Sequence, residues 1–124
     1  MILADTTIWV HHFRAPNDRL KALLDHEQIV MHPFVVAELA LGSLKRRALQ
    51  LDALDDLPAV QIARLDEVRG MIEAHSLYSR GIGLIDAHLI ASCLLEPAVQ
   101  LWTRDKQLAS VAEELGVGAK PGKL

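Results

Sequence analysis

Four carboxylic acids occupy positions in the sequence where acidic side chains are unexpected. Most of the sixteen Asp and Glu residues fall in polar stretches, but four lie within or directly after apolar ones: Asp5, Glu38, Asp86 and Asp105. A carboxylate in apolar surroundings is destabilising unless it is paired, hydrogen-bonded or bound to a metal ion. Converging carboxylates repel one another unless a hard cation neutralises them, and oxygen-only ligands suit Mg²⁺ or Mn²⁺. The pattern predicts a divalent metal site, provided that the fold brings the four acids together.

Each acid also has a simpler structural explanation. Asp5 and Asp105 stand directly before predicted helices, where an Asp side chain commonly caps the first backbone N–H groups. Glu38 would be stable beside a buried arginine. Asp86 is harder to explain in this way, because its helix is apolar on all sides and is expected to be buried. On spacing alone, a shared metal site and four separate structural roles both remain open.

The elements that would position these acids alternate between short apolar strands and helices. Strands are expected at residues 1–4, 28–31, 59–63 (an edge strand), 99–102 and 117–119. Helices are expected at residues 6–13, 18–26 (capped by Asp18), 33–46, 48–55, 65–75, 84–95 and 105–115. This alternation predicts a parallel sheet covered by helices on both faces, and such sheets bind ligands at the carboxyl ends of their strands. Asp5 and Asp105 follow strands and Asp86 begins a helix, so all three belong to that edge. Glu38, about one and a half turns into its helix, can also point there.

Composition and charge narrow the class of protein. The chain has 124 residues, 51% of them hydrophobic and 23% charged, which is typical of one folded domain spanning residues 1–124. No apolar stretch approaches the roughly 18 residues of a membrane span, and we expect neither a membrane anchor nor a secretion signal. The single cysteine, Cys93, fits a reducing compartment, so we expect a cytoplasmic protein.

The net charge of −3 argues against a protein that holds nucleic acid by bulk charge. A polyanionic substrate would need a bound cation or local basic residues. Arg80 and Arg104 are the candidates for contacts with phosphate.

The acids lie in four stretches that resemble a known family. Residues 3–9, residues 36–39 followed by Gly42, residues 83–91 and residues 101–105 resemble the four acidic motifs of PIN-domain ribonucleases. Their order, their intervals and the overall length resemble the VapC toxins of type II toxin–antitoxin pairs, and the likeness covers essentially the whole chain. The resemblance implies a PIN-like three-layer α/β/α fold with a central parallel sheet of about four to five short strands.

The resemblance also implies an activity. It is that of an endoribonuclease toxin that cleaves RNA phosphodiester bonds with metal-activated water, using Mg²⁺, for which Mn²⁺ substitutes. By the same resemblance Thr103, and with it Thr7, supports the site with a hydroxyl group. The acidic metal-binding set carried over from the family is Asp5, Glu38, Asp86 and Asp105. The implied partners are an RNA substrate, a VapB-type antitoxin and a second copy of the chain in a homodimer.

The antitoxin would lie in a groove between the first helices and the third and fourth. Apolar residues expected to form this groove are Trp9, Phe13, Leu41 and Leu44. The remaining candidates favour structural roles. We expect the six histidines to be surface or hydrogen-bonded core residues, and Trp9, Trp102 and Cys93 to pack in the interior.

Two other function classes are weighed against this one. A receiver-type phosphoacceptor domain would use Asp5, Asp55 and Lys106, but Asp55 ends a helical pattern instead of an apolar strand. That hypothesis also leaves Glu38 and Asp86 without a role. A non-enzymatic PIN-like binding module remains possible, although the presence of all four acids gives no sign of a decayed site.

Overall fold

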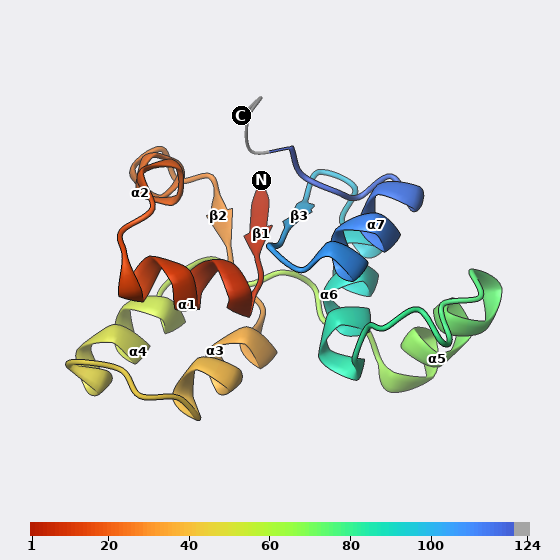
Figure 1. Ribbon diagram of the computed structural model, residues 1–124, viewed down its shortest axis with the longest axis horizontal. Coiled ribbons are helices and arrows are strands. Elements are labelled where there is room, and N and C mark those ends of the chain that lie inside the picture. Colours follow the sequence, from red (N-terminus) through yellow and green to blue (C-terminus); the bar gives the residue numbers. More distant parts are fainter. Residues whose placement is uncertain (121–124) are drawn as a thin grey trace.

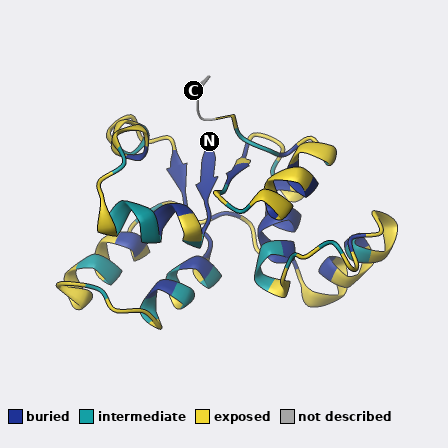
Figure 2. Cartoon of the chain, viewed as in Figure 1, coloured by how far each residue is buried: buried dark blue, intermediate teal, exposed yellow. Residues whose placement is uncertain are grey.

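The centre of the protein is a small parallel sheet, described here from a computed structural model that covers residues 1–120 of the chain. Its strands are β1 (Ile2–Ala4), β2 (Ile29–Val30) and β3 (Gln100–Trp102), in the order β2-β1-β3 (Figure 1). Ile2 lies opposite Ile29 on one side and Gln100 on the other. The strands are almost entirely buried, which explains their apolar sequences (Figure 2).

The sheet has fewer strands than the sequence predicted. Of the described residues, only three segments form strands, and the segments expected at 59–63 and 117–119 form single parallel bridges instead. Met31 pairs with Ala59, and Leu101 pairs with Gly118. After its bridge, the segment at residues 59–63 makes no further pairs with the sheet, and its Gln61 N–H donates to the Glu96 carboxylate. The apolar sequences of residues 59–63 and 117–119 therefore predicted correctly that both segments pair with the sheet. They predicted longer strands than the single bridges that form.

All seven predicted helices are present among the described residues. They are α1 (Thr6–Arg14), α2 (Asp18–Asp25), α3 (Pro33–Ala40), α4 (Arg47–Asp55), α5 (Leu65–Ala74), α6 (Leu84–Leu95) and α7 (Lys106–Glu114). In Figure 1, α1 to α4 gather on the β2 side of the sheet and α5 to α7 on the β3 side. Asp55 is the last residue of α4 and follows no strand, so the receiver-type alternative is excluded.

Two helix ends differ from the prediction. Helix α3 ends at Ala40 instead of residue 46: the Leu41 and Gly42 N–H groups bond to carbonyls three residues back, and the Arg47 guanidinium donates to the Ala40 carbonyl at 2.9 Å. Helix α2 is capped by Asn17 and not by Asp18, since the Asn17 side chain accepts a hydrogen bond from the Leu20 N–H at 3.0 Å.

Helix α6 is the most buried helix of the molecule. Every residue from Ala87 to Cys93 is buried, as its apolar sequence predicted. Cys93, Trp9 and Trp102 are core residues, which confirms their expected packing roles. Within residues 1–120, none of the helices is long and apolar enough to cross a membrane.

Candidate active site

Asp5 is the best anchored of the four acids. It directly follows β1, is 3% exposed, and caps α1 by accepting from the Ile8 N–H at 3.2 Å. The same oxygen accepts from the Thr7 hydroxyl at 2.5 Å, and the second oxygen accepts from the Thr103 hydroxyl. Burial raises the pKa of Asp5 despite these hydrogen bonds. The capping explanation is therefore correct for one oxygen of Asp5, while the other faces the segment after β3.

Two threonines join the ends of the neighbouring strands. The Thr103 hydroxyl accepts from the Asp105 N–H at 3.0 Å, and the Thr7 hydroxyl accepts from the Arg104 N–H at 2.9 Å. The two hydroxyl oxygens lie 3.5 Å apart. These bonds hold the segment after β3 against the start of α1, so Asp5 and Asp105 come from strands nearly 100 residues apart yet share one edge.

Glu38 reaches this edge from α3. The Thr6 hydroxyl, on the residue next to Asp5, donates to the Glu38 carboxylate at 2.6 Å. No buried arginine accompanies Glu38, because the ion pairs of the described residues lie elsewhere, between Arg64 and its acidic neighbours and between Arg80 and Glu114. The side chain is half-buried, which leaves part of it open at the edge of the sheet.

Asp86 and Asp105 complete the group at the starts of two helices. Asp86 accepts from the Gly83 N–H at 3.1 Å, and Asp105 caps α7 by accepting from the Leu108 N–H at 3.0 Å. The pKa of Asp86 is raised by burial and further by the negative charges of the other three acids. Since charges act on one another appreciably only at close range, all four carboxylates belong to one electrostatic cluster: Asp5, Glu38, Asp86 and Asp105.

The chemistry of this cluster suits a hard divalent cation. The donors are all carboxylate oxygens, they repel one another, and none of the ion pairs among the described residues neutralises them. As the side chains stand, no three His, Cys, Asp or Glu residues within 1–120 are grouped closely enough to hold a metal ion. The type and charge of the donors fit Mg²⁺ or Mn²⁺. In their present orientation, however, the three Asp side chains accept hydrogen bonds from backbone N–H groups at helix starts, and Glu38 accepts one from Thr6.

The two arginines expected near phosphate differ in their surroundings. Arg80 forms two parallel hydrogen bonds of 2.9 Å with Glu114 on α7, which raise the pKa of Arg80 and lower that of Glu114. Its guanidinium is thus engaged by a carboxylate. Arg104 is exposed beside Thr7, one residue from Asp105.

A buried aromatic cluster next to α6 was missed by the sequence analysis. His32 is fully buried between Phe34 and His88, with ring centroids 4.9 and 6.3 Å away. Its Nδ1 accepts from the Phe34 N–H and caps α3, a role that its position before Pro33 could have suggested. His32 Nε2 and His88 Nδ1 have no hydrogen-bond partner among the described residues, so the expectation of hydrogen-bonded core histidines holds for His32 only at Nδ1 and is wrong for Nδ1 of His88. Burial, and next the charge of His88, lowers the pKa of His32 to about 4.

A groove of about 740 Å³ lies where the antitoxin site was expected. Phe13 and Leu44 line it, as predicted, and Glu38 forms part of its wall. Trp9 and Leu41 do not contribute, because Trp9 is only 3% exposed in the core and Leu41 is 89% exposed at the end of α3.

Comparisons with known proteins agree with this architecture. A family model described as "PIN domain" matches residues 2–114. Ribonuclease VapC32 of Mycobacterium tuberculosis is 43% identical over 117 residues, which cover 94% of each chain. The crystal structure of FitAcB from Neisseria gonorrhoeae matches over the full length of both chains with a TM-score of 0.65 and 22% identity, a likeness of fold. The chain therefore belongs to the PIN-domain family and, within it, to the VapC-type proteins.

Proposed function

We propose that the protein is a divalent-metal-dependent endoribonuclease that acts as the toxin of a toxin–antitoxin pair. The observation that carries this proposal is the cluster of four carboxylates at the carboxyl edge of the sheet, where burial first, and then the charges of the other three acids, raise the pKa of Asp86. Such a cluster is costly for a protein that does not bind a cation. The kinship with a protein named as a ribonuclease, 43% identical, supports RNA as the substrate.

Four side chains would hold the metal: Asp5, Glu38, Asp86 and Asp105. When bound, Mg²⁺ or Mn²⁺ would polarise the scissile phosphate and lower the pKa of the attacking water. Thr103 and Thr7 are positioning residues, because their hydroxyls fix the two oxygens of Asp5. Thr6 does the same for Glu38.

The three threonine hydroxyls at this cluster are engaged as donors to its carboxylates, and the cysteine and the buried histidines offer no alternative nucleophile. Cys93 is buried in α6, and burial raises the pKa of its thiol to about 12, so it stays protonated at neutral pH. His32 and His88 are buried beside Phe34. Water is therefore the nucleophile that fits the site.

The groove lined by Phe13 and Leu44 would take an apolar segment of the antitoxin. Arg14 and Lys45 also line it, so acidic residues on that segment would complement the groove. Because Glu38 belongs both to the groove wall and to the acidic cluster, a segment bound there would cover one side of the active site. We extend the proposal to a homodimer acting in the cytoplasm, in keeping with the family resemblance.

The decisive test is cleavage of a purified RNA pool by the wild type and by two Asp→Asn variants. We expect cleavage in Mg²⁺ or Mn²⁺, its loss in EDTA, and a fall of several orders of magnitude for Asp86→Asn. Asp52→Asn is the matched control, because Asp52 is exposed on α4 and lies outside the cluster. If Asp86→Asn cleaves as fast as Asp52→Asn, the acidic cluster is not the catalytic centre; if the wild type cleaves no RNA in either metal, the binding-module alternative gains.

A further inference from the structure

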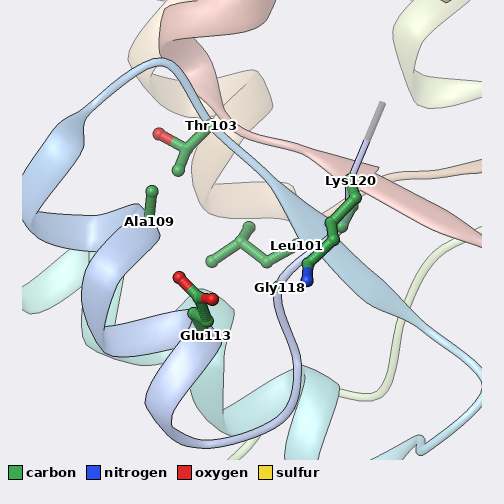
Figure 3. Close-up of a pocket in the computed structure, with 7 residues that line it drawn as sticks. Leu101, Thr103, Ala109, Glu113, Gly118 and Lys120 are labelled. Carbon is green, nitrogen blue, oxygen red and sulfur yellow. The ribbon is translucent and has the colours of Figure 1, made fainter. Parts of the chain in front are cut away.

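A second, smaller cavity is lined in part by Thr103. It has a volume of about 110 Å³ and is enclosed by β3, α7 and the segment at residues 118–120. Leu101 and Ala109 contribute apolar surface, while Glu113 and Lys120 contribute opposite charges. Figure 3 shows the Glu113 carboxylate and the Lys120 ammonium group on either side of the Leu101 side chain.

The position of this cavity ties it to the acidic cluster. Thr103 lines the cavity and also donates its hydroxyl hydrogen bond to Asp5. A group that occupies the cavity therefore lies one side chain away from the carboxylates that would hold the metal. An RNA chain whose phosphate lies at the cluster would therefore have a neighbouring nucleotide beside this cavity.

The two charged groups are available to a ligand. Among the described residues, no hydrogen bond or ion pair engages the side chains of Glu113 and Lys120, although they line the same cavity. The adjacent Glu114 is different, because it is fully engaged by Arg80. One acceptor group and one donor group thus face a small apolar space from different elements.

The close approach of the last segment to α7 depends on a glycine. A Cβ at Gly118 would stand 3.2 Å from the Glu113 N and 3.4 Å from the Ala112 carbonyl carbon, both rigid backbone atoms of the helix. Only a residue without a side chain lets the segment lie so near the helix that Lys120 and Glu113 line one cavity. The cavity is therefore built by the backbone as well as by the side chains.

We propose that this cavity binds the edge of one base of the RNA substrate and prefers guanine; the inference rests on the proposed function. Guanine presents two N–H donors, at N1 and N2, to a carboxylate and a carbonyl acceptor, O6, to an ammonium group. Adenine has no carbonyl oxygen, and uracil has a single N–H donor, so each satisfies fewer of the groups. The volume equals about four water molecules, which suits one planar ring and leaves the sugar and phosphate outside.

The test measures binding and does not depend on cleavage. The full-length Asp86→Asn variant, expected to be inactive, is titrated with fluorescent RNA pentamers of uridine that carry one central guanosine, adenosine, inosine or 2-aminopurine. Inosine lacks the N2 amino group, which removes one proposed bond to the carboxylate; 2-aminopurine lacks both O6 and the N1–H, which removes the bond to the ammonium group and one bond to the carboxylate. We expect guanosine to bind about 10-fold more tightly than adenosine, with inosine and 2-aminopurine in between.

Variants of the cavity assign the preference to its residues. In the same background, Glu113→Ala should abolish the difference between guanosine and inosine, and Lys120→Met should reduce the difference between guanosine and 2-aminopurine to the part that the N1–H contributes. Both residues are exposed, so the variants are expected to fold, and Glu73→Ala on α5 is the matched control that keeps the full preference.

An unchanged base preference in both variants overturns the inference, and so does a protein that binds all pentamers equally or none. These results are distinct from failure of the proposed function, which is the absence of metal-dependent RNA cleavage by the wild type. If the variants change only the affinity for a peptide partner, the cavity belongs to that interface and the inference is wrong.

Discussion

Replacing Thr103 by valine removes the hydroxyl group that joins the ends of β1 and β3 while preserving the shape of the side chain. That hydroxyl donates to Asp5, which is 3% exposed, and accepts from the Asp105 N–H at 3.0 Å. Because water cannot reach the buried Asp5 oxygen, the lost hydrogen bond to a carboxylate costs about 2 kcal/mol, and the bond to the half-buried Asp105 N–H adds about 1 kcal/mol. We therefore expect the free energy of unfolding to fall by about 3 kcal/mol.

Thermal unfolding in EDTA measures this loss. For a domain of 124 residues, about 3 kcal/mol corresponds to a decrease of about 10 °C in Tm. Thr103→Ser is the control, because serine keeps the hydroxyl and lacks only the methyl group. We expect its Tm to lie much closer to that of the wild type.

Two results would refute this reasoning. A Thr103→Val protein that melts within about 2 °C of the wild type would mean that the hydroxyl bonds contribute nothing net. A Thr103→Ser protein as unstable as Thr103→Val would mean that keeping the hydroxyl does not preserve stability, so the loss could not be assigned to the bond with Asp5.

Three further predictions concern other parts of the structure. Thr6→Val should lower kcat/KM for RNA cleavage by about 10-fold, since it frees Glu38 from its 2.6 Å hydrogen bond, and Thr6→Ser should restore it. The pKa of His32 falls from 6.5 to about 4 on folding, so the unfolded chain binds the extra proton. Stability from this group is complete above pH 6.5 and is lost as the pH falls towards 4, by up to about 3 kcal/mol; urea titrations of His32→Asn should lack this component. Because burial raises the thiol pKa of Cys93 to about 12, the native protein should react with a disulfide reagent only after unfolding, and prompt labelling at pH 8 would contradict its burial.

The helices of the fold follow largely from local sequence. The limits of α6 were predicted correctly, because a continuous apolar run is bounded by Gly83 before it and Pro97 after it. The end of α3 was not, since apolar residues continue to Leu44 while the chain leaves the helix at Ala40. At that end the Ala40 carbonyl accepts a hydrogen bond from Arg47 of the following helix, a contact that has no sequence pattern.

The candidate site was predictable only in part. The four acids stand out in the sequence because they lie within or beside apolar stretches, and the charges of the other three act on Asp86, although within residues 1–120 no three of them are grouped closely enough to hold a metal ion. The hydroxyls that orient them do not stand out, because the bond from Thr6 to Glu38 joins residues far apart in the chain and exists only once α1 and α3 are packed. The contact between His32 and His88 could not be predicted for the same reason, because it joins distant residues and forms only when α6 packs against the start of α3.

The most direct test of the account compares thermal melts of the wild type and Asp86→Asn, first in EDTA and then with millimolar Mn²⁺. In EDTA we expect Asp86→Asn to be at least as stable as the wild type, because the substitution removes one charge from a like-charged cluster. Mn²⁺ at ten times its dissociation constant should stabilise the wild type by about 1.4 kcal/mol, a rise of a few degrees, and leave the variant unchanged. Equal shifts in both proteins, or a shift in neither, would contradict the claim that the four carboxylates form a metal site.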